Sequence, residues 1–366
     1  MAFFKNAIYF LATRINFANF EAYSNSVKKN LIAGFTIIIL LISCHKEEKI
    51  LDILSNYNSS MELQGYHFGD KLELPEEVKK NAEAISITLG NKETSNLMID
   101  PVFFTLGDNK AIFNIKTKNG ESLTQEATIN VFTKNPEETI SYQIVAEYPH
   151  DPENFVQGFQ LEGNIIYESD GGKGVSKLLK YALGATTPLA LTRQREKDFS
   201  EGCTIVGNKI IQLTWQSKKG YVYDKNSLKL LSEFTYPNLL GEGWGLTYDG
   251  ENLIASDGSK HLFFLDPENP SRLVKTVAVA GNTRTYTQLN ELEYHNGFIY
   301  ANVWGKPVIL KINPDSGEVV GKLDLRGIAK KNTKGENDVL NGIAFKGENM
   351  LVTGKNWTKI YEIALK

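Results

Sequence analysis

The segment Asp249-Gly250-Glu251-Asn252-Leu253-Ile254-Ala255 contains the pattern that decides the fold, a polar turn followed directly by a short apolar strand. The asparagine of this turn recurs every 44 residues in four copies, at Asn164, Asn208, Asn252 and Asn296. With a fifth copy, the apolar strands that follow the turns are 165–167, 210–213, 253–255, 298–301 and 350–352. A repeat of about 40–45 residues that contains several strands is typical of a β-propeller, in which each repeat forms one blade.

Each repeat continues with a second apolar strand. These second strands are 178–181, 221–223, 262–265, 308–312 and 360–363. Five repeats predict an all-β protein whose residues 140–366 form a five-bladed β-propeller. The last repeat is longer, and we expect its insertion, within the Lys- and Asn-rich stretch 327–338, to be a surface loop.

The chain before the repeats has a different pattern. Apolar residues alternate with polar ones at Ile85, Ile87 and Leu89, as in a half-buried strand. Further alternating segments and turns predict a small immunoglobulin-like β-sandwich over residues 55–134, an accessory domain that precedes the propeller. Residues 135–138 read as the linker.

The first residues resemble a bacterial lipoprotein signal. Lys28 and Lys29 precede the apolar run 31–42, which is too short to span a bilayer comfortably. The run ends in Leu41-Ile42-Ser43-Cys44, which resembles a lipobox. We therefore expect a leader and signal peptide over 1–43, lipidation of Cys44, and a tether over 44–54. A plain membrane anchor is the alternative. The lipoprotein hypothesis places the protein in the cell envelope, at the outer membrane, on its periplasmic face or the cell surface.

The composition is that of an ordinary globular protein. The formal net charge of −3 does not indicate a nucleic-acid-binding protein. Two cysteines make a disulfide framework improbable, and the apolar surroundings of Cys203 indicate a core residue.

Alignment of the repeats places chemically active residues in two equivalent positions. The first position, just before each turn-and-strand unit, holds Gln157, Glu201, Trp244, Asn290 and Asn341. The second, 13 or 14 residues later, holds Asp170, Trp215, Asp257, Trp304 and Lys355. In a propeller, such positions form rings around the central axis. Ordinary core packing is the alternative for each tryptophan alone. Together with a carboxylate, an ammonium and amides, the tryptophans indicate a pocket for a small, partly cationic substrate.

Eight segments in consistent order carry a family resemblance. They are Phe155-Val156-Gln157-Gly158, Phe199-Ser200-Glu201-Gly202, Gln212-Leu213-Thr214-Trp215, Gly243-Trp244-Gly245-Leu246, Leu289-Asn290-Glu291-Leu292-Glu293-Tyr294, Ala301-Asn302-Val303-Trp304, Leu340-Asn341-Gly342-Ile343-Ala344 and Val352-Thr353-Gly354-Lys355. Residues 140–366 thus resemble the plant-type glutaminyl-peptide cyclotransferases, or glutaminyl cyclases, which also occur in bacteria. That family is a five-bladed propeller, in agreement with the repeat count. Where it often has glycine, this chain has Ser200.

The resemblance implies an acyltransferase that converts the N-terminal glutamine of peptides or proteins to pyroglutamate and releases ammonia. It implies that Glu201 is the general acid and base. The expected substrate-binding residues are Phe155, Gln157, Phe199, Trp215, Trp244, Asn290, Trp304 and Lys355. No cofactor and no metal are expected, and a closed propeller is expected to be a monomer.

Two other functions remain open from the sequence. A metal-dependent lactonase-type propeller would gather carboxylates such as Asp170, Asp257 and Glu201 around one cation. A non-catalytic ligand-binding propeller would bind without releasing ammonia.

Overall fold

The computed structural model describes residues 48–366, which divide into two compact units. The predicted leader, the signal peptide and Cys44 lie outside these residues. Within 48–366, no helix is long and apolar enough to cross a membrane.

Before Glu138, the described chain forms one five-stranded sheet in the order β1-β5-β4-β2-β3. Its strands are β1 (Tyr66–His67), β2 (Ala82–Leu89), β3 (Lys92–Thr94), β4 (Gly107–Thr117) and β5 (Ser122–Phe132). Buried and exposed residues alternate along β4, with Ala111, Phe113 and Ile115 buried. One face of this sheet therefore belongs to a core.

The predicted immunoglobulin-like sandwich is wrong. A sandwich needs two packed sheets, whereas this part of the chain pairs its single sheet with helical residues 48–64 and the short helix α2 (Glu76–Asn81). Ile50, Leu54 and Val78 pack with Ile115 of β4. Ile50 and Leu54 are four residues apart, on one face of a helix. Residues 48–54, which were expected to belong to a tether, are therefore part of a helix that packs on the sheet.

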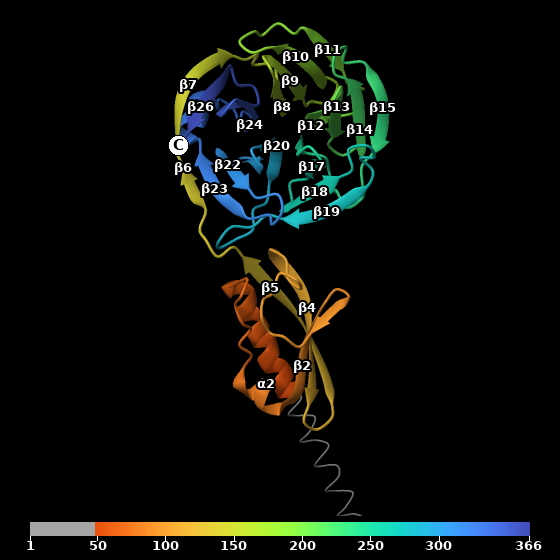
Figure 1. Cartoon of the computed structure of the whole chain (residues 1–366), viewed down its shortest axis with the longest axis vertical. Helices are drawn as coiled ribbons and strands as arrows, with labels where there is room; N and C mark the ends of the chain where they lie inside the picture. Colours follow the sequence, from red (N-terminus) through yellow and green to blue (C-terminus); the bar gives the residue numbers. More distant parts are fainter. Residues whose placement is uncertain (1–47) are drawn as a thin grey trace, which may run out of the picture. The chain divides into compact units, whose positions relative to one another are not determined.

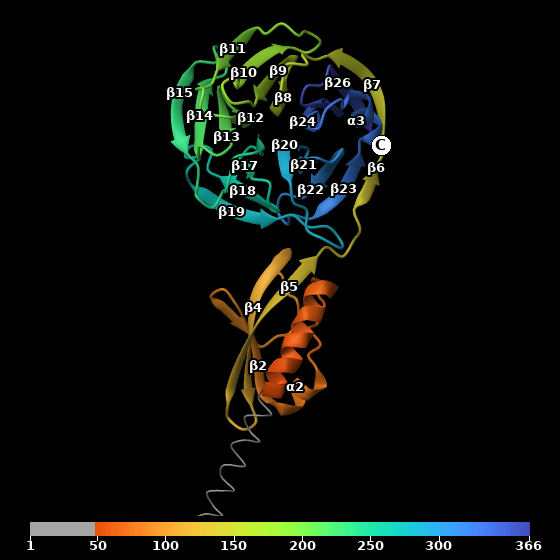
Figure 2. The same ribbon diagram turned by 180° about the vertical axis from the view of Figure 1, so that it is seen from behind.

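Residues 138–366, which are the greater part of the second unit, contain five sheets, four of four strands and one of five. Figures 1 and 2 show them arranged around a common centre. The innermost strands are β8 (Val156–Glu162), β12 (Ser200–Val206), β16 (Leu246–Tyr248), β20 (Leu289–His295) and β24 (Leu340–Lys346). Each innermost strand contacts the innermost strands of both neighbouring sheets, so the ring of contacts is closed.

The strands outside the innermost ones follow the repeats. The second strands are β9 (Ile165–Asp170), β13 (Lys209–Thr214), β17 (Leu253–Ser256), β21 (Phe298–Val303) and β25 (Asn349–Gly354). The third strands are β10 (Lys177–Ala182), β14 (Lys219–Asp224), β18 (His261–Leu265), β22 (Val308–Ile312) and β26 (Lys359–Leu365). The outermost strands are β11 (Ala190–Arg193), β15 (Leu230–Thr235), β19 (Leu273–Ala278), β23 (Val319–Asp324) and β7 (Tyr142–Pro149). All ten strand segments predicted from the repeats are confirmed.

The two strands at the start of this unit join sheets formed by the end of the chain. β7 pairs antiparallel with the last strand, β26. β6 (Glu138–Ile140) pairs parallel with β23 and supplies the fifth strand of its sheet. Pairing of β7 with the last strand, β26, satisfies backbone groups that an open edge would expose.

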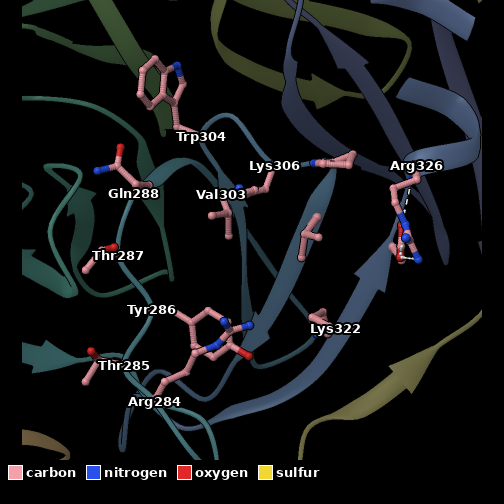
Figure 3. A pocket seen from close by; sticks show the side chains of 13 residues that line it. Arg284, Thr285, Tyr286, Thr287, Gln288, Val303, Trp304, Lys306, Lys322 and Arg326 are labelled. Atoms are coloured by element: carbon pink, nitrogen blue, oxygen red, sulfur yellow. Dashed lines mark hydrogen bonds and ion pairs between the residues drawn. The ribbon is translucent and has the colours of Figure 1, made fainter. Parts of the chain in front are cut away.

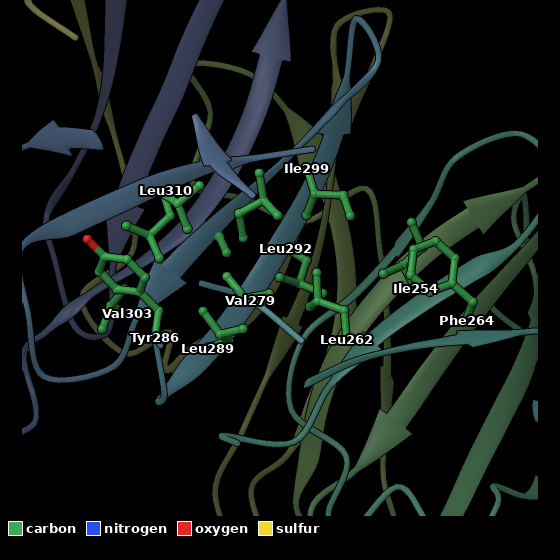
Figure 4. Packing of buried hydrophobic residues seen from close by; sticks show 13 residues of the cluster. Ile254, Leu262, Phe264, Val279, Tyr286, Leu289, Leu292, Ile299, Val303 and Leu310 are labelled. Carbon is green, nitrogen blue, oxygen red and sulfur yellow. The ribbon is translucent and has the colours of Figure 1, made fainter. Parts of the chain in front are cut away.

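Apolar side chains fill the space between neighbouring sheets. Figure 4 shows Ile254, Leu262 and Phe264 of the third sheet beside Leu292 and Ile299 of the fourth. Full burial of such a side chain contributes about 1.5–3 kcal/mol. This packing holds the sheets in the positions that bring their innermost strands together.

The insertion in the last repeat is not entirely a loop. Its first half is helix α3 (Arg326–Asn332), in which Ile328 and Asn332 are buried. The Asn332 side chain donates hydrogen bonds to the Ile328 carbonyl oxygen and the Tyr361 hydroxyl. The following residues, 333–337, are exposed as predicted. The insertion has too few apolar residues to indicate a helix from its sequence. Tertiary contacts, such as the hydrogen bond from Asn332 to Tyr361, hold the helix in place.

Replacing Gly245 by alanine is expected to lower the free energy of unfolding. A Cβ atom at Gly245 would lie 1.9 Å from the Asn290 carbonyl oxygen on the neighbouring innermost strand. Because backbone must move, the cost is expected to be about 1–3 kcal/mol or more, measurable by urea denaturation. Gly327→Ala is the matched control, since its Cβ meets no atom nearer than 3.7 Å. Equal stability of the two variants would contradict the close packing of these strands.

Candidate active site

The first set of aligned residues lies at β-bulges. In β8, β12, β20 and β24, the pairing with the second strand shifts register at the same place. Gln157, Glu201, Asn290 and Asn341 are the residues at these shifts. A bulge leaves an extra residue outside the ladder and changes the direction of its side chain. In a regular strand, side chains alternate between the two faces of the sheet. The bulges interrupt this alternation at the four polar residues.

Glycines next to these residues allow the innermost strands to approach closely. A Cβ at Gly202 would lie 2.4 Å from the Leu246 nitrogen, and one at Gly158 would lie 2.4 Å from the Cys203 nitrogen. The equivalent residue on β20 is Glu291, which is buried. Its carboxylate accepts hydrogen bonds from the backbone nitrogens of Phe159 (3.3 Å) and Ile343 (2.9 Å). Glu291 thus links three innermost strands just behind the polar ring.

Three members of the ring are joined by hydrogen bonds. The Gln157 amide nitrogen donates to Glu201 Oε1 (3.3 Å), and the Asn341 amide nitrogen donates to Gln157 Oε1 (3.3 Å). Asn341 also donates to the Val156 carbonyl oxygen (2.8 Å). These side chains come from β8, β12 and β24, and all three are buried. The chain of amides therefore orients one carboxyl group at the centre of the ring.

Glu201 and Lys355 form a buried pair of ionisable groups. Burial raises the pKa of Glu201 well above its usual value, while the charge of Lys355 opposes the rise. Burial lowers the pKa of Lys355 to about 8, and the negative charge of Glu201 opposes that fall. The pKa values of the two groups thus move toward each other. A carboxyl group with a raised pKa is suited to both taking and giving a proton.

A cluster of three aromatic side chains adjoins Lys355 through Phe155. Lys355 Nζ lies 4.7 Å from the centre of the Phe155 ring. Phe199 makes edge contacts with both Phe155 (6.3 Å) and Trp215 (5.7 Å). These three aromatic side chains are partly exposed, so they form a wall that a ligand can reach.

Trp244 and Trp304 make a second edge contact, at 6.2 Å between ring centres. Trp304 is 47% exposed, so it lies at the open side of the site. The buried side-chain oxygen of Asn290 has no hydrogen-bond partner among the described residues, and the same holds for that of Asn341. Two unpartnered buried acceptors are suited to a ligand that carries N–H donors.

Glu242 is a site residue that the sequence analysis missed. Its carboxylate accepts hydrogen bonds from the indole nitrogens of Trp215 and Trp244 (3.1 Å for Trp244) and from the Gln216 amide (3.0 Å). Burial raises the pKa of Glu242, but these hydrogen bonds outweigh burial and the pKa is lowered. Its charge further raises the pKa of Glu201. The only signal was an acid between two glycines, two residues before Trp244.

Two aspartates aligned with this site have other surroundings. Asp257 accepts backbone hydrogen bonds from Gly241 (3.2 Å) and Ser259 (2.9 Å), so it caps loops. Asp170 is buried, with Lys177 Nζ 3.4 Å from its carboxylate. Burial, followed by the charge of Glu168, raises the pKa of Asp170 well above its usual value. Within residues 48–366, no three His, Cys, Asp or Glu side chains are grouped to hold a metal ion.

A buried ion pair supports the segment that carries Lys355. His150 Nε2 lies 3.1 Å from the Glu168 carboxylate, and His150 Nδ1 donates to the Trp357 carbonyl oxygen (2.8 Å). Burial lowers the pKa of His150, but Glu168 more than offsets it and the pKa is raised. No sequence motif indicates this pair, because its members are 18 residues apart, with His150 directly after β7 and Glu168 on β9. The predicted core position of Cys203 is confirmed by its burial.

Comparisons with known proteins agree with this geometry. The family model described as glutamine cyclotransferase matches residues 115–365. A glutaminyl-peptide cyclotransferase from Arabidopsis thaliana is 38% identical over 231 residues, which cover 61% of this chain and 71% of that protein. The crystal structure of Myxococcus xanthus glutaminyl cyclase matches with a TM-score of 0.58 and 31% identity, over 63% of this chain and 98% of that one. The chain belongs to the glutamine cyclotransferase family.

Proposed function

We propose that this protein is a glutaminyl-peptide cyclotransferase with Glu201 as general acid and base. The observation that carries the assignment is the buried Glu201 carboxyl, which accepts a hydrogen bond from Gln157 and interacts with Lys355 inside an aromatic wall. Membership of the glutamine cyclotransferase family supports the reaction itself.

In the reaction, the α-amine of an N-terminal glutamine attacks the carbon of its own side-chain amide. A carbon–nitrogen bond forms within the five-membered ring, and the bond to the side-chain nitrogen breaks. Glu201 accepts the proton that the amine loses and gives it to the leaving nitrogen, which departs as ammonia. A positioned group that transfers protons in this way contributes about 10²–10⁴-fold to the rate.

Because both reacting groups belong to one residue, the site must hold a folded conformer of the glutamine side chain. The unpartnered amide oxygens of Asn290 and Asn341 are suited to accept hydrogen bonds from the substrate amine and amide N–H groups. The ammonium of Lys355 is suited to stabilise the oxyanion that develops when the amine attacks. Phe155, Phe199, Trp215, Trp244 and Trp304 would bury the side chain and exclude water.

Three further proposals extend the expectations from the sequence. The closed ring of five sheets supports a five-bladed propeller that acts as the catalytic domain, with residues before 135 as an accessory domain. Closure of the ring by strands of one chain supports a monomer.

The lipobox-like Leu41-Ile42-Ser43-Cys44 supports a lipid-anchored protein of the cell envelope, at the outer membrane. Mass analysis of the N-terminus after membrane extraction tests that anchor.

Ammonia release from glutaminyl dipeptides is the expected result when the protein is assayed with and without a chelator. The rate is expected to rise as Glu201 loses its proton. It is expected to fall as Lys355, whose pKa is about 8, loses its proton. The pH profile of kcat/KM is thus expected to be bell-shaped, with the substrate α-amine, whose pKa is about 7.7–8.0, also titrating in this range. Saturable dipeptide binding without ammonia release would instead support a binding protein.

A further inference from the structure

A cavity adjoins the proposed active site beside Trp304. Its volume is about 450 Å³, and Figure 3 shows the side chains that line it. They come from the segment that leads into β20, from the turn between β21 and β22, and from the end of β23. All of these lie at the end of the fourth sheet where β20 begins, which is the end that carries Asn290 and Trp304. The cavity therefore lies at the same end of the fourth sheet as Asn290 and Trp304.

Two residues connect the cavity to the proposed active site. Trp304 lines the cavity and also makes the edge contact with Trp244. Gln288 lines the cavity two residues before Asn290, and its carbonyl oxygen accepts a hydrogen bond from the Trp304 backbone nitrogen (2.8 Å). Gln288 holds a left-handed backbone conformation, with φ of 63°, which turns the chain sharply at this point. The cavity thus adjoins the site through the segment that leads into β20 and through the Trp304 indole ring.

The cavity is lined by cationic side chains. Lys306, Lys322 and Arg284 face it together with Arg326, and its one acidic residue, Asp324, is already paired with Arg326 at 2.7 Å. Neither Lys306 nor Lys322 forms an ion pair with any residue between 48 and 366. The Arg284 guanidinium lies 5.0 Å from the centre of the Tyr286 ring.

A neighbouring cavity is also lined by cationic side chains. Its volume is about 440 Å³, and it shares Lys306 and Arg326 with the first cavity while adding Lys330 and Glu336. The two cavities together have five cationic and two acidic lining residues, whereas the whole chain has a net charge of −3. Positive charge is therefore concentrated at this edge of the site, where it attracts anionic groups.

We propose that this cation-lined cavity binds acidic side chains of the substrate peptide, in the residues that follow the N-terminal glutamine. The proposal rests on the proposed function, because a glutamine held at Glu201 places the rest of its peptide outside the aromatic wall. An extended peptide advances about 3.3–3.6 Å per residue, so the residues next along it pass the exposed Trp304. Lys306 and Lys322 then supply unpaired ammonium groups to carboxylates.

The test compares two amidated peptides, Gln-Ala-Asp-Asp-Ala and Gln-Ala-Asn-Asn-Ala, by kcat/KM for ammonia release. The acidic peptide is expected to be the better substrate at low salt, by up to about fivefold for each cation that it meets. The preference is expected to shrink toward 1 M salt, because exposed charges are screened there. In the double variant Lys306→Gln/Lys322→Gln, the preference is expected to disappear. A glutaminyl dipeptide, too short to reach the cavity, gives the reference rate for every variant.

The matched control is Lys209→Gln/Lys229→Gln. It removes two lysines from the second sheet, at the end away from Glu201. Retention of the preference in this control, with its loss in the first double variant, supports the cavity assignment. Equal rates on both peptides, with normal dipeptide turnover, overturn the subsite and leave the cyclotransferase intact. A preference that survives in both double variants also overturns it. No ammonia from any peptide, dipeptide included, overturns the proposed function.

Discussion

Replacing Glu201 by glutamine is expected to lower kcat for ammonia release by about 10²–10⁴-fold, the contribution typical of a positioned proton-transfer group. Glutamine has nearly the same shape as glutamate, and its amide oxygen can still accept the hydrogen bond that Gln157 donates to Glu201. The variant loses the ability to take a proton from the α-amine and return it to the leaving nitrogen, and it removes the negative charge that acts on Lys355. Binding of a non-cyclising glutamine analogue is therefore expected to persist.

The stability of Glu201→Gln is expected to be close to that of the parent protein. The carboxyl is 5% exposed and pays a desolvation cost when it ionises, which an amide avoids. Glu233→Gln is the control, since Glu233 lies on β15 and pairs with Arg195 and Lys219. Measurement of kcat beside the thermal unfolding midpoint separates chemistry from folding. A folded Glu201→Gln variant with full activity would contradict the proposed role.

Replacing Lys355 by methionine is expected to lower kcat/KM by about 10²–10³-fold, the loss typical when one group that stabilises an oxyanion is removed. Methionine keeps an unbranched side chain of similar length against Phe155 but removes the ammonium. Lys355 is 4% exposed, so its charge acts in surroundings where water screens it little.

The pH profile separates this role of Lys355 from a packing role. The alkaline limb at a pKa of about 8 is expected to be lost or replaced, because the titrating ammonium is gone. The acid limb is expected to move to higher pH, because Lys355 is the charge that lowers the pKa of Glu201. Lys359→Met is the control, four residues further on and paired with Glu147 at the surface. A profile of unchanged shape in Lys355→Met would show that the ammonium takes no part in the titration.

The repeat made the second unit predictable. Turn and strand recur every 44 residues, and each copy contains its own local signal, so all ten strand segments could be placed without knowledge of their partners. The region before residue 135 has no repeat. Its alternating strands predicted a sandwich, whereas the helical spacing of Ile50 and Leu54 indicated a helix that covers a single sheet. Periodicity can assign one element, but the number of sheets in a small region depends on pairing between distant segments.

The sequence by itself determined which residues occupy equivalent positions, since Gln157, Glu201, Trp244, Asn290 and Asn341 follow from the alignment of the repeats. It also determined the family, through eight ordered segments. Only the tertiary structure decided what these residues do to one another. The hydrogen bond from Gln157 to Glu201 joins residues 44 positions apart, and the pKa of Glu201 depends on burial and on Lys355, which is further still along the chain.

The same reason explains the residues that sequence analysis missed. Glu242 matters because two tryptophans from different repeats donate to it, and His150 matters because it reaches Glu168 and the Trp357 carbonyl oxygen together. Asp257 occupies an aligned position yet caps a loop. A repeat places a side chain near the axis, whereas its contacts, exposure to water and proton affinity are set by neighbours that come from other repeats.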